Sequence, residues 1–186
     1  MLRTTRRTFI KVAGSAIVTT SLLGLGSFTQ ASPDIVRPPG AVAEQDFKNR
    51  CLRCHQCIDA CPEKALSSGH ITQGWNVTAT PVLTSACTLC MKCTEQCPSG
   101  ALARIKSQDA RMGTAFILEK ECVGCDKCIK PCPTGAIKKV PGKRLVAVDA
   151  AKCTGCMMCV KHCPVTPVAI KITPEGAKRP KVSSKA

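Results

Sequence analysis

One cysteine pattern, repeated four times, constrains this chain more than any other feature of its sequence. The pattern is C-x2-C-x2-C-x3-C followed by proline, and its copies span residues 51–62, 87–98, 122–133 and 153–164. Together the copies contain all 16 cysteines of the chain. With this spacing, three thiolates of a motif bind one iron-sulfur cluster and the fourth binds the other cluster of a pair. The pattern therefore predicts four [4Fe-4S] clusters.

The spacing follows from what a cube of irons and sulfides requires. Each iron takes one thiolate, and gaps of two residues let one loop supply three corners of the cube. The last cysteine lies about one helical turn after the third, so it can point toward a second cluster. The following proline has no N–H and ends that turn. The predicted iron ligands are Cys51, Cys54, Cys57, Cys61, Cys87, Cys90, Cys93, Cys97, Cys122, Cys125, Cys128, Cys132, Cys153, Cys156, Cys159 and Cys163.

Other uses of so many cysteines agree less well with the pattern. Disulfides could form in an exported chain, but disulfide frameworks do not repeat one ligand spacing four times. Structural zinc sites usually place a loop between two C-x2-C pairs, whereas here three cysteines follow one another at gaps of two residues. A three-iron cluster would need a motif with a missing cysteine, and every copy is complete.

Composition and charge agree with clusters as part of the core. Aromatic residues make up 3% of the 186 residues, with no Tyr, one Trp and four Phe, too few to fill an ordinary core. The protein should therefore fold poorly without its clusters. Of the formal charge of +15, four clusters remove about 8. We interpret the basic residues as compensation for these anions, and no aromatic stacking platform is visible, so nucleic-acid binding is not expected.

Residues 1–31 have the organisation of an export signal. The letters TRRTFIK around Arg6 and Arg7 resemble a twin-arginine signal, and a mildly apolar run over 12–28 follows. This run is short and rich in Ser, Thr and Gly for a membrane span, and cleavage is expected after Ala31, with an uncleaved anchor as the alternative. Twin-arginine export carries proteins already folded around a cofactor, which predicts a periplasmic location.

The rest of the chain divides into three parts. Residues 32–47 contain the letters RPPG and predict a linker arm, with docking to a partner as the alternative. Residues 48–172 form the four-motif region, and residues 173–186 predict a basic, mobile tail.

Short hairpins are expected between and after the motifs. Segments 136–140 and 145–148 flank a Pro-Gly pair and predict strand, turn and strand. Segments 101–105 and 114–118 predict a second hairpin with a longer connection, and 168–172 predicts a closing strand. The fold class is therefore α+β, with two bacterial-ferredoxin-like 2[4Fe-4S] modules, short helices, small antiparallel hairpins and little regular secondary structure.

Side chains other than cysteine give weaker signals. Trp75 is either a packing anchor or an exposed partner contact. The histidines, interpreted as supporting or surface residues because each motif already has four thiols, are His55, His70 and His162. The methionines interpreted as apolar cover are Met112, Met157 and Met158. Asp and Glu are scattered, and no phosphate loop, Ser-His-Asp order or flavin fingerprint occurs, which favours an electron carrier over an enzyme.

Several short stretches resemble the ferredoxin-type NapG/MauM family, exported four-cluster proteins associated with periplasmic nitrate reductase and methylamine utilisation. Besides the twin-arginine start, the matching stretches are RPPGA at 37–41, CLRCHQC at 51–57, CPSGAL at 97–102 and DARMG at 109–113. All four motifs here are regular, whereas the middle motifs of the nitrate-reductase branch carry inserted residues.

The resemblance implies an electron relay. The donor would be a membrane-bound ferredoxin-type quinol-oxidising subunit and the acceptor a periplasmic redox enzyme or cytochrome, an arrangement that allows peripheral membrane association. Two alternatives are a tightly bound iron-sulfur subunit of a molybdoenzyme-like complex and a maturation factor for such an enzyme.

The resemblance also bears on how the motifs pair. The electron-transfer subunits of molybdoenzymes pair the first motif with the fourth and the second with the third. Local spacing instead favours first with second and third with fourth, because the last two motifs alone resemble a small two-cluster ferredoxin. Both pairings use the same ligands and differ only in where the fourth cysteines bind: Cys61, Cys97, Cys132 and Cys163.

Overall fold

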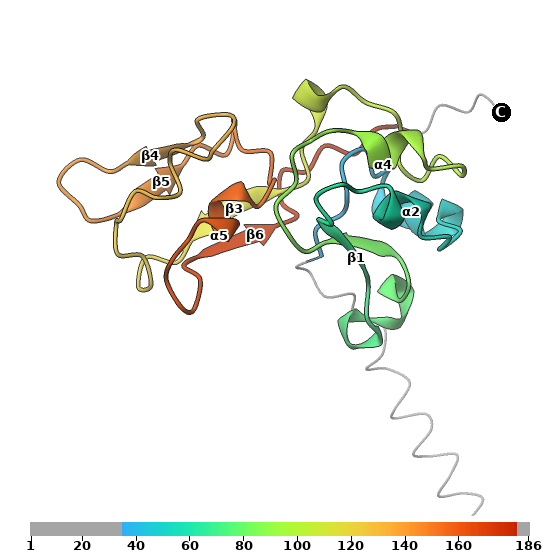
Figure 1. The fold of residues 1–186 in the computed structure, drawn as a ribbon, viewed down its shortest axis with the longest axis horizontal. Helices are drawn as coiled ribbons and strands as arrows, with labels where there is room; N and C mark the ends of the chain where they lie inside the picture. The colour runs from blue at the N-terminus through green and yellow to red at the C-terminus, as the bar shows by residue number, and fades with distance from the viewer. Residues whose placement is uncertain (1–34, 182–186) are drawn as a thin grey trace, which may run out of the picture.

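The computed structural model describes residues 35–181 and consists of two lobes that lie side by side (Figure 1). The N-terminal lobe contains the first two cysteine motifs and the C-terminal lobe the last two. The export signal predicted over residues 1–31, with Arg6 and Arg7, lies outside the described residues. Among the described helices, none has the length and apolar character needed to span a membrane.

The helices are short, and three of them carry a motif cysteine. Helix α2 spans Glu44–Arg50, while α3 (Gln56–Asp59), α4 (Lys92–Glu95) and α5 (Met158–Lys161) are single turns. Each single turn begins one residue before the third cysteine of its motif, in agreement with the helical turn expected between the third and fourth cysteines. The corresponding residues of the third motif form turns without a regular helix. Single 3₁₀ turns occur at Ile71–Gln73, Trp75–Val77 and Ser107–Asp109.

Three two-stranded antiparallel sheets complete the fold. They pair β1 (Leu66–Ser68) with β2 (Pro81–Leu83), β3 (Thr114–Ile117) with β6 (Ile170–Thr173), and β4 (Ile137–Lys139) with β5 (Val146–Val148). The β4–β5 hairpin confirms the predicted strand, turn and strand, and β6 confirms the closing strand. The β1–β2 hairpin was not predicted.

The predicted hairpin between 101–105 and 114–118 is wrong. Strand β3 pairs with β6, with Ala115 opposite Ile172, because both strands direct apolar side chains into the core. The backbone of 101–105 instead follows the N-terminal arm, where the Ala103 N–H donates to the Gly40 carbonyl at 2.7 Å. The first and last strands of the C-terminal lobe therefore close around the third and fourth motifs.

The segment predicted as a linker arm is part of the core where the structure describes it. Residues 36–42 are all buried, and the Leu83 N–H donates to the Val36 carbonyl at 2.8 Å. Within this segment Arg37 is fully buried, and its guanidinium lies 4.6 Å from the Phe47 ring centre. An arm that supplies a buried charge and backbone pairing is a packing element rather than a spacer.

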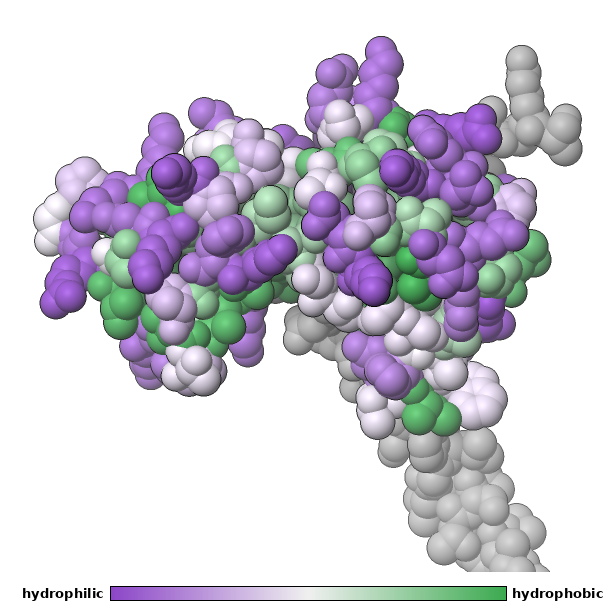
Figure 2. Space-filling model, in the orientation of Figure 1, coloured by the Kyte–Doolittle hydropathy of each residue, from purple (hydrophilic) through white to green (hydrophobic). Residues whose placement is uncertain are grey.

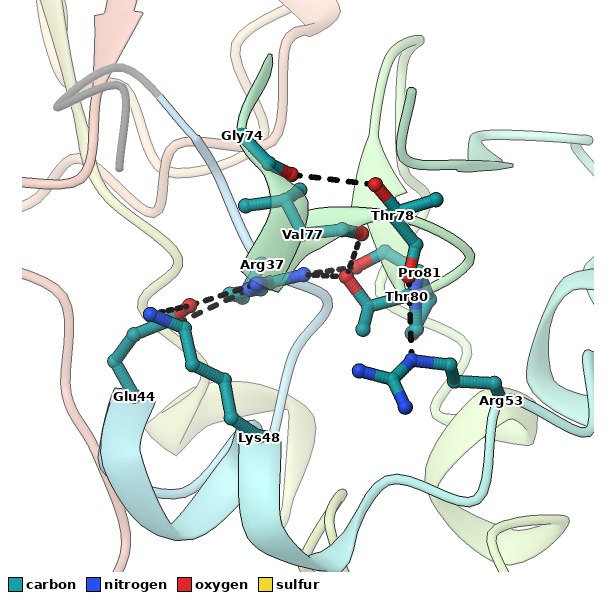
Figure 3. Close-up of polar contacts among 9 residues, drawn as sticks. All are labelled: Arg37, Glu44, Lys48, Arg53, Gly74, Val77, Thr78, Thr80 and Pro81. Atoms are coloured by element: carbon teal, nitrogen blue, oxygen red, sulfur yellow. Dashed lines mark hydrogen bonds and ion pairs between the residues drawn. The ribbon is translucent and has the colours of Figure 1, made fainter. Parts of the chain in front are cut away.

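Arg37 connects three segments that are distant in sequence (Figure 3). Its Nη2 lies 2.7 Å from Oε1 of Glu44, and its Nε donates to Oε2 of the same carboxylate at 3.1 Å. On the other side, Nη1 donates to the Thr80 hydroxyl at 2.7 Å and to the Pro81 carbonyl at 3.1 Å. The guanidinium therefore joins the arm, α2 and the start of β2.

The described part of the tail forms hydrogen bonds with the rest of the chain. The Lys178 N–H donates to the Arg111 carbonyl at 3.0 Å, and the Thr114 hydroxyl donates to the Glu175 carbonyl at 2.9 Å. Residues 174–181 thus contact the segment between the lobes, which fixes their path through hydrogen bonds that the sequence does not reveal.

Cysteines form much of the core, and hydrophilic side chains cover most of both lobes (Figure 2). Cys57, Cys93 and Cys159 belong to the same buried cluster as Phe47 and Leu102. In Figure 2, apolar side chains also gather at the lower edge of the left-hand, C-terminal lobe. A core built on cysteine agrees with the low aromatic content and leaves space for inorganic clusters.

Of the two alternatives predicted for Trp75, the structure agrees with an exposed side chain. Its side chain is 72% exposed, in a 3₁₀ turn of the β1–β2 connection. It therefore does not anchor that connection.

Candidate iron-sulfur sites

The structure gathers the sixteen cysteines into four groups, which we number by the motif that supplies three of the thiols. Hollows lined by cysteines define three groups: Cys87, Cys90, Cys93 and Cys61 at site 2, Cys122, Cys125, Cys128 and Cys163 at site 3, and Cys153, Cys156, Cys159 and Cys132 at site 4. At site 1, burial raises the pKa of Cys57 to about 12, and the neighbouring thiols that add to this shift are Cys97, Cys51 and Cys54.

This grouping corresponds to one of the two pairings that the sequence left open. The fourth cysteine of the first motif lies at site 2 and that of the second motif at site 1. The fourth cysteines of the last two motifs are exchanged in the same way. Each lobe therefore contains its own pair of sites, first with second and third with fourth.

The three hollows have nearly the same size. They measure about 320 Å³ at site 2, about 330 Å³ at site 3 and about 300 Å³ at site 4. Their remaining lining is largely apolar, with Met91 and Leu66 at site 2 and Ile172 and Ala115 at site 4. Three similar hollows, each with four thiols, suit three copies of one group.

The backbone repeats one conformation around the second cysteine of every motif. The residues just before and just after that cysteine have φ between 54° and 70° in all four copies: Arg53 and His55, Leu89 and Met91, Gly124 and Asp126, Gly155 and Met157. Alternation between right- and left-handed backbone turns successive N–H groups to one side and forms an anion-binding concavity, as in many iron-sulfur sites. Non-glycine residues adopt this conformation rarely, so its repetition indicates a shared requirement of the four loops.

Backbone N–H groups also point at the cysteine sulfurs. The Ala65 N–H lies 3.3 Å from Sγ of Cys61, and three further N–H groups lie 3.4 Å from a sulfur: Leu89 at Cys87, Leu102 at Cys97 and Ala115 at Cys153. Hydrogen bonds of this kind stabilise a negative sulfur and adjust the reduction potential of a cluster.

Burial makes the free thiols hard to ionise. It raises the pKa of Cys93 and of Cys159 to about 12, with nearby thiols adding to the shift. Burial likewise raises the pKa of Cys87 and of Cys128 to about 11. At Cys132 burial acts in the same direction, but the Thr134 hydroxyl and backbone N–H groups outweigh it and lower the pKa. Thiolates at the four positions with a raised pKa need a nearby cation, which the irons of a cluster would supply.

The arrangement also differs from the two alternatives considered for the cysteines. All sixteen are free thiols in the structure, without a disulfide. Over residues 35–181, no group of three or more Cys, His, Asp or Glu side chains is close enough to hold one metal ion. One zinc would need its four thiolates within about 4 Å of one another, and no such group occurs in this range.

Of the other predicted residues, Met158 lines the hollow of site 4, and the histidines lie at the surface. His55, His70 and His162 are exposed, which agrees with a surface position. Met112 is fully buried, while Met157 and Met158 are half-buried against the core, as expected of apolar cover.

The glycines three residues after the last cysteine of the second and third motifs serve the turn. Gly100 and Gly135 have φ of 68° and 59°, and no protein atom lies within 4 Å of where a Cβ would be. At these positions glycine meets the need for a left-handed backbone.

The two lobes meet through loops that carry the cysteine groups. The Cys87 N–H of site 2 donates to the Cys156 carbonyl of site 4 at 2.8 Å, and the Met112 N–H donates to the Thr154 carbonyl at 2.9 Å. A Cβ on Gly155 would lie 2.7–2.9 Å from backbone atoms of Gly113. Sites 2 and 4 therefore face each other across the lobe boundary.

The sequence did not predict the left-handed residues or the contact between the lobes. Aligning the four motifs would have revealed the first, because Gly124 and Gly155 occupy the position that Arg53 and Leu89 hold in the other copies. The contact between the lobes has no comparable local signal.

Comparisons with known proteins agree with this geometry. Three overlapping segments match families described as 4Fe-4S dicluster domain, over residues 50–102, 86–136 and 115–172. These segments cover every pair of adjacent motifs. The comparisons therefore indicate several [4Fe-4S] clusters without selecting one pairing.

The similar curated proteins are ferredoxin-type proteins. The chain is 36% identical over 122 residues to "Ferredoxin-type protein NapG" of Escherichia coli (strain K12), which covers 61% of this chain and 52% of that protein. It is 43% identical over 58 residues to "Methylamine utilization ferredoxin-type protein MauM" of Methylobacillus flagellatus, which covers 31% of this chain and 24% of that protein. The chain thus spans about half the length of NapG and a quarter of this MauM.

Proposed function

This chain is a ferredoxin-type protein of the NapG/MauM family, and we propose that it is an electron carrier holding four [4Fe-4S] clusters, without a substrate site of its own. The observation that carries this proposal is the exchange of fourth cysteines within each lobe, which gives every site four thiols. A bound cluster supplies reversible one-electron transfer, and four thiolates are its usual ligand set.

The chain's own residues would hold and adjust the clusters. The sixteen cysteines would provide the thiolates, while the N–H groups of Ala65, Leu89, Leu102 and Ala115 would stabilise negative charge on sulfur. Buried apolar side chains such as Leu66 and Ile172 would keep water from sites 2 and 4. Burial and hydrogen bonding are two of the means by which a protein sets the reduction potential of such a group.

The proposed place of the protein is a relay at the outer face of a membrane. A membrane-bound ferredoxin-type quinol-oxidising subunit would supply electrons, and a periplasmic redox enzyme or cytochrome would accept them. The family resemblance and the name of MauM, which refers to methylamine utilisation, support this role. The twin-arginine sequence at Arg6 and Arg7 supports export of the folded protein to the periplasm.

Chemical analysis of anaerobically purified protein tests the carrier proposal. About sixteen irons and sixteen sulfides per chain are expected, at four of each per cube, together with uptake of about four electrons in a reductive titration. Cys159→Ser should lower the iron content by about four, whereas Met158→Leu in the same loop should leave it unchanged. Zinc in place of iron, or iron that accepts no electrons, would contradict the proposal.

A further inference from the structure

A wide, shallow basin of about 1090 Å³ lies directly outside site 3. Its lining consists of Cys125, Asp126, Lys127, Lys130, Pro131 and His162. Cys125 and Asp126 also line the inner hollow of site 3, so the two hollows share one wall. A group bound at site 3 would therefore be separated from the basin by a ligand loop only.

Positive charge dominates the basin. Its carboxylate, Asp126, is paired with Lys139, whose Nζ lies 2.6 Å from Oδ2. Lys127 and Lys130 form no ion pair with any residue in the described part of the chain. Two lysine charges therefore face the basin without a compensating carboxylate.

Basic side chains near the exposed cysteine of site 1 form hydrogen bonds within the chain. The Arg53 guanidinium donates to the Thr78 carbonyl at 3.2 Å, and the His55 ring lies 3.2 Å from the Ala79 carbonyl (Figure 3 shows the contact of Arg53). Leu52 beside them is 68% exposed. At the edge of site 1 the basic side chains are thus held by hydrogen bonds to backbone carbonyls. At the edge of site 3, Lys127 and Lys130 are exposed to solvent.

We propose that the basin over Cys125, rimmed by Lys127 and Lys130, is the docking surface for an acidic redox protein that exchanges electrons at site 3. This inference rests on the electron-carrier function proposed above. An anionic cluster alone would repel an acidic partner, and lysines in front of it reverse the potential that the partner meets. Complementary charge of this kind guides encounter and orientation more than it adds affinity.

Lysines over a cluster could instead do no more than compensate its charge. In that case they would support cluster retention without contacting a partner. The two roles make different predictions. A docking surface binds an acidic polymer at the basin, whereas charge compensation requires no such binding.

Binding of a labelled poly-aspartate peptide, followed by fluorescence anisotropy on the cluster-loaded full chain, separates these roles. Lys127→Glu/Lys130→Glu should weaken binding at low salt by about tenfold, because it removes the contact and reverses the local potential. Arg104→Glu/Lys106→Glu is the matched control, since it changes the net charge equally at exposed residues outside the thiol loops. Equal loss of binding in both variants would overturn the proposal.

Oxidation kinetics supply the second measurement. When one electron passes from the reduced protein to hexacyanoferrate(III), the oxidant becomes hexacyanoferrate(II). Lys127→Glu/Lys130→Glu should slow this step about threefold or more at low salt and accelerate oxidation by a cationic cobalt(III) complex. Poly-aspartate should inhibit the wild type and the control variant but not the basin variant.

The outcomes also separate this proposal from the carrier function. If the purified protein lacks clusters or cannot be reduced, the carrier proposal is contradicted before any docking is measured. A loaded, reducible basin variant that binds poly-aspartate and reacts with both oxidants as the control does would overturn the docking surface alone.

Discussion

The backbone N–H of Cys87 donates a 2.8 Å hydrogen bond to the carbonyl of Cys156, and this bond joins a cysteine loop of site 2 to a cysteine loop of site 4. Cys87 and Cys156 belong to different lobes, so the two pairs of sites meet at this point. The path from the sulfur of one site to the sulfur of the other crosses only two residues and one hydrogen bond. We therefore expect electrons to cross between the lobes from site 2 to site 4.

Replacing Gly155 tests this contact. Gly155→Ala should displace the loop of site 4, because the new Cβ would meet the Gly113 backbone, just before β3, at 2.7 Å in a left-handed conformation with φ of 70°. The Cys156 carbonyl, which accepts from the Cys87 N–H, would move with that loop. Electron paramagnetic resonance of the fully reduced protein should then lose the magnetic interaction between sites 2 and 4 and keep the interactions within each lobe. Gly135→Ala is the control, since it has the same left-handed strain of about 1–2 kcal/mol and open space around the Cβ. Identical spectra for both variants would contradict a close contact of the two sites.

Removing the carboxylate of Glu44 should destabilise the N-terminal lobe, and removing the Arg37 charge as well should recover part of the loss. Glu44→Gln leaves a fully buried guanidinium without its carboxylate, at a cost of about 2–4 kcal/mol. Adding Arg37→Met should recover part of the loss, because the unpaired charge disappears and the side-chain volume is roughly kept. The measurement is the guanidinium midpoint of visible absorbance under anaerobic conditions. Asp46→Asn, an exposed change on the same helix, should shift the midpoint little, and a double variant less stable than Glu44→Gln would contradict this account of the pair.

Chelation of the iron should unfold both lobes. Cysteines such as Cys57, Cys93, Cys128 and Cys159 are part of the buried core, and the hollows between them would fill with water once the clusters are lost. Cluster binding and folding are therefore coupled, as in other small metal-dependent domains. Limited proteolysis should show rapid cleavage throughout residues 35–181 of the apoprotein and protection of the loaded protein. Equal protection of both forms would mean that the polypeptide core is sufficient.

The sequence predicted features whose cause is local. The ligand spacing, the single helical turns at the third cysteines and the β4–β5 hairpin around Pro141-Gly142 each depend on residues a few positions apart. The left-handed residues are also local, and a comparison of the four copies would have found them from Gly124 and Gly155.

Features with distant causes were not predicted from the sequence. The burial of Arg37 depends on its partners Glu44 and Thr80, which lie 7 and 43 residues away in the sequence. The letters RPPG alone resemble a spacer. The pairing of motifs could not be chosen, because all four end in the same Cys-Pro and either exchange satisfies the local chemistry. It depends on chain closure, above all on the pairing of β3 with β6 around the last two motifs.

Alkylation of the Cys97→Ser variant most directly tests the central claim, which is that the chain builds four cysteine groups by exchanging fourth cysteines within each lobe. The variant should lose the cluster of site 1, so that mass spectrometry after anaerobic alkylation finds Cys51, Cys54 and Cys57 modified. Ser99→Ala, two residues away, should leave all three protected. Modification of Cys122, Cys125 and Cys128 in the Cys97→Ser variant would show that the second motif pairs with the third, and would contradict the account.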